Sequence, residues 1–223
     1  ISFFLKKISF FEYVHSEIGS LIYIDGFLRK KKSHDNDVHN TFCFFKGKYI
    51  ANIYANKLVE ERLTEQGVKI IKNKFLYFLI KPIFAFDSKF KNKNYAPLKY
   101  EEYSKFSKVK WLNDDEKKLK VELNEFFQFK ENDWFVCFFA RDSHYDEKYR
   151  PDMKESFEIR NSDINTFVPA MEFITSKGGY AIRIGSDNKS TLKFDDNKRI
   201  IDYSIMSNKN PKIDFLLIMF CKF

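Results

Sequence analysis

Glycine, proline and cysteine are all scarce in this chain of 223 residues. Its 7 Gly and 5 Pro are too few for a collagen-like or linker-like chain, and its 27 Phe argue against disorder. The three cysteines, Cys43, Cys137 and Cys221, lie far apart and form no CxxC pair. Neither a disulfide framework nor a thiolate zinc site is indicated, and a reducing compartment is expected.

Long apolar runs are also missing. No run approaches the ~20 residues that span a bilayer. The apolar start at 1–5 meets Lys6 and Lys7 at once, which is not the pattern of a signal peptide. The chain begins without Met and stops in an apolar stretch at 213–223. Both ends are therefore interpreted as cuts, the second one inside a domain.

Basic residues outnumber acidic ones, with 39 Lys and Arg against 31 Asp and Glu and a net charge of +8. Only seven of them are Arg, and Lys, Asn, Ile and Phe are abundant together, as an AT-rich coding bias would produce. Compositional bias is one explanation of the positive charge, and a polyanion-binding face is the other. In such a chain, an Arg is expected to mark a need for planar, bidentate hydrogen bonding.

Short apolar runs alternate with helical patterns along the first third of the chain. Residues 8–14, 41–45 and 68–71 predict strands, because β-branched and aromatic residues dominate them. Helical spacing follows each of the first two strands. An aromatic helix starts at Lys74 and is expected to be interrupted near Pro82. This alternation predicts a parallel sheet covered on both faces.

The last third of the chain begins a second alternation of strands and helices. Residues 134–140 form a continuous apolar run, which is typical of a strand buried on both faces. Further strands are predicted at 180–184 and 200–205, and helices at 116–129, within 163–177 and at 214–221. The predicted fold class is α/β, with two Rossmann-like domains, the second incomplete. We expect the domains to be 1–95 and 131–223, joined by a connection and helix at 96–130 and meeting at a cleft.

The most informative segment is the strand-to-loop junction at 139–145, Phe-Ala-Arg-Asp-Ser-His-Tyr. Open parallel sheets bind ligands beyond the carboxyl ends of their strands, and Arg141 is expected there. A guanidinium at that place can donate two parallel hydrogen bonds to a diphosphate. The alternative is a surface Arg paired with Asp142 or Glu147.

Three other segments are candidates for the same edge. Residues 160–163, Arg-Asn-Ser-Asp, precede a predicted helix, where an ordinary helix cap is the alternative. Gly185 follows a strand, at a point that requires close backbone approach. Asp202 and Tyr203, in the next predicted strand, are ambiguous by themselves. The chain has no GxGxxG, Walker A, GxSxG or kinase pattern, so a dehydrogenase is not indicated.

Metal-binding patterns are weak. Asp35 and Asp37 resemble a DxD motif, but they lie in a polar loop where Asp and Asn are typical turn residues. The four His residues have no HxH or HExxH spacing. No metal site is predicted.

Several segments, in order, resemble a known family. They are 134–141, 160–164, Pro169-Ala170-Met171-Glu172, 178–185 (Gly-Gly-Tyr-Ala-Ile-Arg-Ile-Gly) and Ile201-Asp202-Tyr203. This succession resembles a family of bacterial glycosyltransferases with a two-Rossmann (GT-B) architecture, distantly similar to O-fucosyltransferases. The resemblance is dense over 134–223. It is thinner over 12–63, where an Ile-Gly turn and an Ala-Asn pair match.

The resemblance implies transfer of a sugar from a nucleotide-sugar donor to a surface polysaccharide or glycoconjugate acceptor, without a metal or other cofactor. The first domain would hold the acceptor, with Gly19 in its turn, and the second would hold the donor. Arg141 would bind the diphosphate, and no residue is assigned as the catalytic base. The implied donor-binding residues are Arg141, Asp142, Tyr145, Arg160, Asn161, Arg183, Gly185, Asp202 and Tyr203.

Two departures from the family pattern bear on activity. The first turn is Glu17-Ile18-Gly19-Ser20 where the family has Arg-Ile-Gly-His, and the chain stops at Phe223, before the Gly/Ser-rich loop and helix that should complete the donor site. A catalytically inactive, sugar-binding relative is therefore one alternative.

The other alternative is a basic, aromatic-rich module that binds nucleic acid or another polyanion. The aromatics fall in periodic apolar segments and are expected in the core, so nucleic acid is not the expected partner. A cytoplasmic location, or a peripheral one at the cytoplasmic face of the membrane, is expected.

Overall fold

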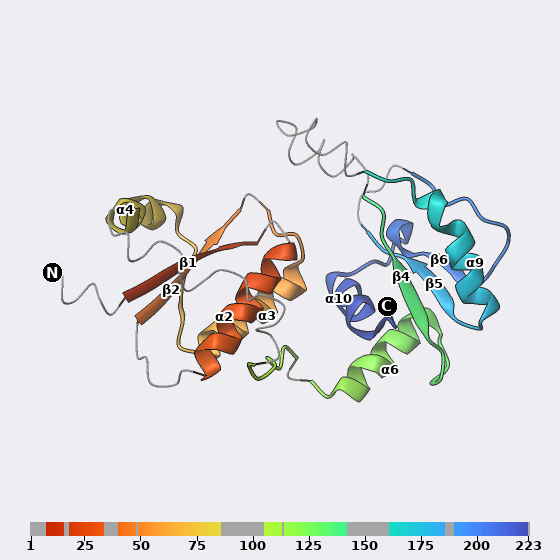
Figure 1. Cartoon of the computed structure of the whole chain (residues 1–223), viewed down its shortest axis with the longest axis horizontal. Coiled ribbons are helices and arrows are strands. Elements are labelled where there is room, and N and C mark those ends of the chain that lie inside the picture. The colour runs from red at the N-terminus through yellow and green to blue at the C-terminus, as the bar shows by residue number, and fades with distance from the viewer. Residues whose placement is uncertain are drawn as a thin grey trace. The chain divides into compact units, whose positions relative to one another are not determined.

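The computed structural model describes residues 8–15, 18–33, 40–47, 49–85, 105–112, 114–141, 161–185 and 190–222. The chain divides into two compact units, Ile1–Asn113 and Asp114–Phe223. Each described unit is an α/β arrangement around a three-stranded parallel sheet (Figure 1). The division lies inside the stretch 96–130 that the sequence assigned to a connection. The helix of that stretch belongs to the second unit.

The sheet of the first unit has the strand order β1-β2-β3. Its strands are β1 (Ile8–Val14), β2 (Asn40–Lys46) and β3 (Lys69–Ile71), and its helices are α2 (Leu21–Ser33), α3 (Ile53–Glu65) and α4 (Lys74–Ala85). A short 3₁₀ turn, η1 (Ile18–Ser20), precedes α2. Figure 1 shows α2 and α3 on one face of the sheet and α4 on the other. Right-handed connections between successive parallel strands place both crossover helices on the same face.

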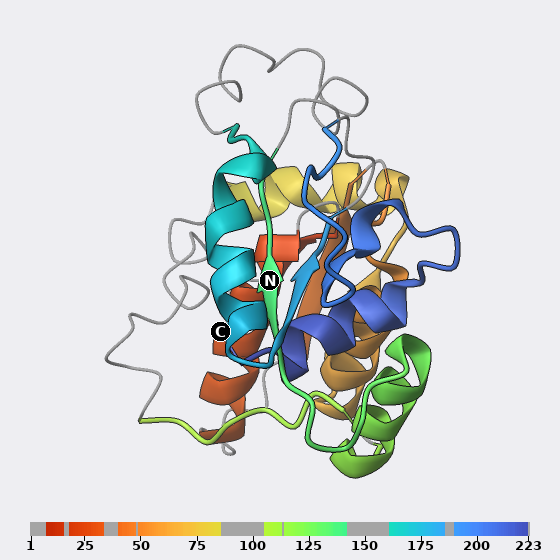
Figure 2. The same cartoon turned by 90° about the vertical axis from the view of Figure 1, so that its right-hand side faces the viewer.

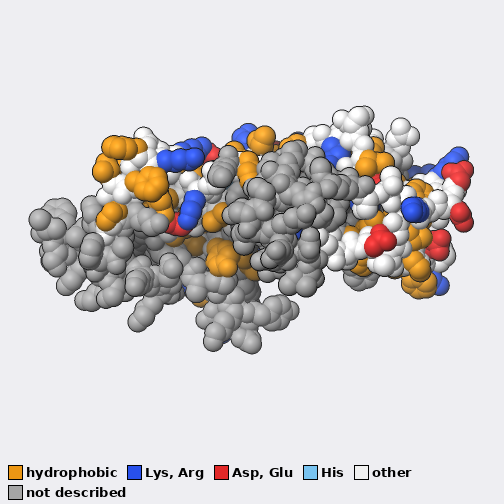
Figure 3. All heavy atoms as spheres, turned by 90° about the horizontal axis from the view of Figure 1, so that it is seen from above, with side chains coloured by type: hydrophobic (Ala, Val, Ile, Leu, Met, Phe, Trp, Pro, Cys, Tyr) orange, Lys and Arg blue, Asp and Glu red, His pale blue; other side chains and the backbone are white. Residues whose placement is uncertain are grey.

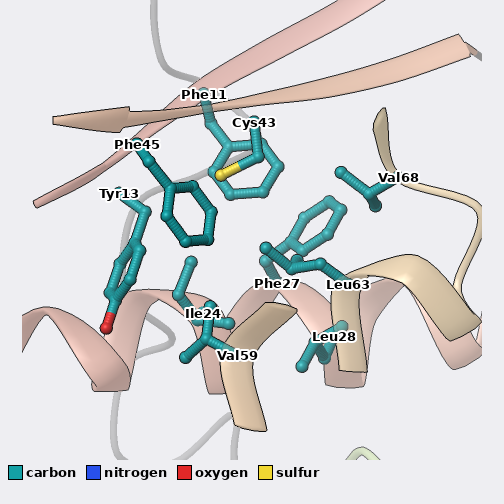
Figure 4. Close-up of a cluster of buried hydrophobic side chains, with 10 residues drawn as sticks. All are labelled: Phe11, Tyr13, Ile24, Phe27, Leu28, Cys43, Phe45, Val59, Leu63 and Val68. Atoms are coloured by element: carbon teal, nitrogen blue, oxygen red, sulfur yellow. The ribbon is translucent and has the colours of Figure 1, made fainter. Parts of the chain in front are cut away.

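Alternate side chains of β1 and β2 point into the core of this unit. Phe11 and Tyr13 are buried under α2 and α3, whereas Glu12 between them is exposed. Figure 4 shows these rings facing side chains from both helices. The buried cluster comprises Phe11, Tyr13, Ile24, Phe27, Leu28, Cys43, Phe45, Val59, Leu63 and Val68. Burying a large apolar side chain contributes about 1.5–3 kcal/mol, so this cluster is the main source of stability of the first unit.

α4 departs from the sequence prediction because it continues through Pro82 to Ala85. Proline inside a helix lacks one N–H and clashes with the preceding turn, which was the reason to expect an interruption. Pro82 is exposed and lies in the last turn of the helix, so water can reach the carbonyl that its missing N–H leaves unbonded.

The second unit also has sequential strand order, β4-β5-β6. Its strands are β4 (Phe135–Phe138), β5 (Tyr180–Arg183) and β6 (Ile200–Asp202), and its helices are α6 (Glu116–Phe127), α9 (Val168–Ser176) and α10 (Pro211–Phe220). The short 3₁₀ turns are η3 (Ile164–Phe167) and η4 (Tyr203–Ile205). Figures 1 and 2 show α9 on one face of this sheet and α6 with α10 on the other. The apolar run at 134–140 lies between these helices, but it is not buried throughout as predicted. Phe135, Val136 and Ala140 are buried and Phe139 is 61% exposed, and only the central residues form the strand.

The helix boundaries in this unit follow local sequence. The side chain of Asp115 accepts a hydrogen bond from the Lys117 N–H at the start of α6, and Asn210 accepts one from Ile213 at the start of α10. α9 ends ahead of Gly178, whose φ of +83° is unfavourable for a residue with a Cβ. A Cβ on the next residue, Gly179, would come within 2.7 Å of the Trp134 ring. α9 therefore ends at Ser176, inside the stretch 163–177 where the sequence predicts a helix.

Truncation of Leu63 tests the core of the first unit. Leu63 is fully buried among the aromatic rings of that unit, so we expect Leu63→Ala to lower the free energy of unfolding by ~2–5 kcal/mol. The measurement is urea denaturation followed by far-UV circular dichroism. Ile53→Ala, at a residue 65% exposed on the same helix, is the matched control and should change stability by less than about 0.5 kcal/mol. Equal losses in the two variants would contradict this description of the core.

Candidate functional site

The carboxyl ends of β4, β5 and β6 meet at one edge of the second sheet. Phe138 is in register with Arg183, and Arg183 is in register with Asp202. We call this the carboxyl edge, and it comprises the strand ends with the residues directly after them, 139–141, 184–185 and 203–204. Ligands of open parallel sheets bind at such an edge.

Arg183 is the most deeply buried charged residue of the described chain, with no exposed surface. Its Nη1 donates to Asp202 Oδ2 at 3.0 Å and to the carbonyl oxygen of Ser190 at 2.7 Å, and its Nη2 donates to Ser190 Oγ at 3.1 Å. Only a planar guanidinium can serve these partners at once. The side chain therefore ties the ends of β5 and β6 to the loop that follows β5.

Asp202 uses both of its carboxylate oxygens within the protein. Oδ2 accepts from Arg183, and Oδ1 accepts from the hydroxyl of Ser204. The ion pair is almost entirely removed from water, because the two side chains are 1% and 8% exposed. A buried charge is tolerated only when it is paired and hydrogen-bonded, so each partner requires the other. Arg183 and Asp202 thus hold the ends of β5 and β6 together inside the unit.

Tyr203 lies in the core and not at the surface of the edge. Its side chain is fully buried, and its ring packs edge-on against Phe126 and Phe127 of α6. The phenol donates to the carbonyl oxygen of Asn210 at 3.3 Å and accepts from the Asn210 N–H at 3.2 Å. Burial raises the pKa of Tyr203. The sequence hypothesis placed this ring beside a nucleotide, but in the structure it joins the sheet to α6.

Arg141 follows β4 by three residues and is half-buried. Ala140 before it is buried in the cluster under α9, and the carbonyl of Arg141 accepts the Ser162 N–H at 2.9 Å. These contacts fix its backbone from both sides. They also bring Asn161 beside Arg141, two candidates that lie twenty residues apart in sequence.

Two polar atoms at this edge lack a hydrogen-bond partner. They are Nε of Arg183 and Oδ1 of Asn161, both buried. An unsatisfied buried polar group costs about 1–3 kcal/mol, and natural structures usually provide it with a partner. One donor and one acceptor are therefore available for a polar ligand or for water at the carboxyl edge.

The turns at this edge are joined by Lys209, a residue that the sequence did not identify. Lys209 donates from Nζ to the carbonyls of Gly185 and Ser204 at 2.8 and 2.9 Å, joining the turns after β5 and β6. Gly185 has a φ of +138°, which only glycine adopts readily. A long lysine side chain in a lysine-rich chain has no local pattern that would have revealed this role.

The helix cap next to the edge is Asp163, and not Asn161 or Ser162. Asp163 Oδ1 accepts the backbone N–H of Asn165 at 2.9 Å, and this hydrogen bond lowers the pKa of Asp163. Asn165 in turn accepts the backbone N–H of Lys193 at 2.8 Å. The start of η3 and the loop after Ser190 are thus linked, and Asn161 is left without a capping role.

The remaining predicted site residues are not at this edge or are not described. Asp142, Tyr145 and Arg160 lie outside the described residues, as do Asp35 and Asp37. Gly19 is exposed in η1 of the first unit, without a positive φ. Among the described residues, no three His, Cys, Asp or Glu side chains are grouped as metal ligands. In the same part of the chain, every helix is too short or too polar to cross a membrane.

Comparisons with known proteins do not assign this chain to a family. No protein-family model, no curated protein and no solved structure matches it. Any functional assignment therefore depends on the geometry of the carboxyl edge and on the residues that form it.

The buried ion pair gives a direct test of the edge. Asp202→Ala leaves the Arg183 charge buried without its carboxylate, so we expect the free energy of unfolding to fall by ~3–5 kcal/mol. Replacing both residues by apolar ones, Arg183→Met with Asp202→Leu, should recover most of this loss. Urea denaturation of the three proteins gives the comparison.

The matched control for this test is the exposed ion pair between Lys57 and Glu61, whose charged atoms are 3.8 Å apart. Lys57→Ala should cost less than about 1 kcal/mol, because water screens that pair. If Asp202→Ala costs no more than Lys57→Ala, the ion pair does not hold the carboxyl edge together.

Proposed function

We propose that this chain is a glycosyltransferase of the two-Rossmann GT-B type that binds a nucleotide-sugar donor at the carboxyl edge of β4–β6. One observation carries the proposal: this edge holds a buried, unpaired donor on Arg183 and a buried, unpaired acceptor on Asn161, where parallel sheets bind ligands. The resemblance of the surrounding segments to bacterial glycosyltransferases supports sugar transfer as the reaction. The βαβαβ order of the first unit supports a second Rossmann-like domain for the acceptor.

Arg141 is the ligand of the donor diphosphate in this proposal. Its backbone is fixed by β4 and by the hydrogen bond from Ser162, so little freedom is lost when a ligand binds. Its guanidinium can donate two parallel hydrogen bonds to phosphate oxygens. Gly185, without a side chain, allows the diphosphate to approach the backbone after β5.

The reaction is a displacement at the anomeric carbon of the donor sugar. The acceptor hydroxyl oxygen forms a bond to that carbon, while the bond to the diphosphate breaks and its electron pair leaves with the nucleoside diphosphate. The hydroxyl proton passes to a base. Arg141 offsets the negative charge that develops on the departing diphosphate, which lowers the barrier. The acceptor is a polysaccharide or glycoconjugate held by the first domain.

Arg141→Lys tests the donor site. A lysine keeps the charge but cannot reproduce the two parallel hydrogen bonds, so nucleoside diphosphate binding should weaken by ~1.5–3 kcal/mol, or about 10- to 150-fold. The measurement is isothermal titration calorimetry with GDP, UDP, ADP and CMP. The melting temperature should barely change, because the substitution removes no apolar contact.

Arg199→Lys is the matched control. Arg199 precedes β6, at the opposite edge of the same sheet, where it donates to the Gly178 carbonyl and lies over the Tyr180 ring. Arg199→Lys should leave nucleotide affinity unchanged. Equal affinity in Arg141→Lys and the unaltered chain would refute the donor site.

Two further outcomes separate the alternatives. Binding of polynucleotide with a steep negative salt dependence, and none of nucleoside diphosphates, would favour a polyanion-binding module. Binding of the nucleotide-sugar without any release of nucleoside diphosphate in the presence of glycan acceptors would favour an inactive, sugar-binding relative.

A further inference from the structure

The helix α4 presents apolar side chains to solvent. Phe75 is 71% exposed and Phe78 is 69% exposed, and Leu76 and Leu79 are exposed beside them. Single exposed apolar residues are ordinary, but four large ones within five residues form a patch of the kind that marks a binding surface. In the space-filling view, hydrophobic side chains gather over α4, with Lys or Arg and some Asp or Glu side chains beside them (Figure 3).

The orientation of α4 is fixed by Tyr77. Its hydroxyl donates to Glu12 of β1, and its ring packs edge-on against Phe44 of β2, with 5.2 Å between the ring centroids. Phe75 and Leu79 each lie two residues from Tyr77, which places them roughly 200° around the helix from it. The apolar side of α4 therefore faces away from the sheet, which is the reverse of an ordinary surface helix.

The segment of the chain that forms this patch carries only basic charges. Between Glu65 and Asp87 it contains no acidic residue, and it has four lysines, Lys69, Lys72, Lys74 and Lys81. Lys74 is exposed at the first position of the helix. Lys69 is exposed, and its Nζ lies 5.4 Å from the ring centroid of Phe42, on the same side of β2 as the ring of Phe44 that contacts Tyr77. Lys72 instead pairs with Glu60 of α3. The carboxylate beside α4, Glu12, is paired with Lys46, so the described side chains around the patch carry a net positive charge. The patch is therefore complementary to a surface that is apolar inside and negatively charged outside.

We propose that α4 is an interfacial helix that binds the surface of a lipid bilayer containing anionic headgroups. Phe75, Phe78 and Leu79 would enter the boundary between headgroups and acyl chains, and the lysines would contact phosphates. α4 has 12 residues and is about 18 Å long, too short to cross the bilayer, so it lies in the plane of the interface. This inference goes beyond the proposed function and does not depend on it.

The charges favour a bilayer over a second copy of the chain. In a symmetric dimer the same patch would pack against itself, bringing two sets of lysines together, while the nearby Glu12 is already paired with Lys46 of its own chain. That repulsion opposes self-association, whereas the same lysines attract anionic lipid.

Vesicle sedimentation of the intact chain tests the proposal. We expect binding to phosphatidylcholine vesicles that contain phosphatidylglycerol, and at least about tenfold weaker binding to phosphatidylcholine alone. Phe75→Ala with Phe78→Ala should weaken binding to the anionic vesicles by about tenfold or more, because both rings leave the interface. Lys69→Gln with Lys74→Gln should remove most of the preference for phosphatidylglycerol.

The control removes the same number of exposed apolar side chains elsewhere. Phe173 of α9 and Ile218 of α10 are 60% and 52% exposed, so Phe173→Ala with Ile218→Ala should bind vesicles as the unaltered chain does. Circular dichroism should show all variants folded. Vesicle binding unaffected by the α4 variants would overturn the proposal. The proposal would also be overturned if the chain did not bind vesicles but formed a dimer in analytical ultracentrifugation, and if Phe75→Ala with Phe78→Ala dissociated that dimer.

Discussion

The second unit depends on one interaction, the buried ion pair of Arg183 with Asp202. Without it, the carboxyl ends of β5 and β6 would carry two isolated charges away from water, each at a cost of several kcal/mol. With it, the same guanidinium also holds Ser190 beside the ends of β5 and β6. The pair thus makes a polar edge compatible with a packed sheet. A donor site at this edge would be held rigid by the same pair of residues.

Much of the fold could be predicted from periodicity alone. β1 occupies the predicted residues, Ile8–Val14, because alternating side chains with one buried face fix both the strand and its direction. The stop at Gly178 follows from its backbone freedom. The helix through Pro82 was mispredicted, because a local rule on proline does not include solvent access to the carbonyl that it leaves unbonded. The strand expected at 200–205 ends at Asp202, where Ser204 turns back to the carboxylate and the chain enters η4.

The candidate site was less accessible to sequence reasoning. A buried apolar run indicates that the next polar residue stands at a strand end, which is how Arg141 was found. The pairing of Arg183 with Asp202 depends on the register of β5 with β6, and nineteen residues separate the two in sequence. Burial of Tyr203 depends on α6, from another part of the chain. The exposed face of α4 could not be anticipated either, because a helix rich in Phe and Leu is normally assigned to a core, and only Tyr77 shows which side is turned to the sheet.

The central claim, a nucleotide site at the carboxyl edge, is tested most directly by mapping amide chemical shifts in the ¹⁵N-labelled chain during a titration with nucleoside diphosphates. The account predicts that the amides of Arg141, Asn161 and Gly185 shift and saturate together. The amides at the amino ends of the same strands, Phe135, Tyr180 and Ile200, should stay in place. Shifts spread over the lysine-rich surface, or confined to the amino ends of the strands, would contradict it.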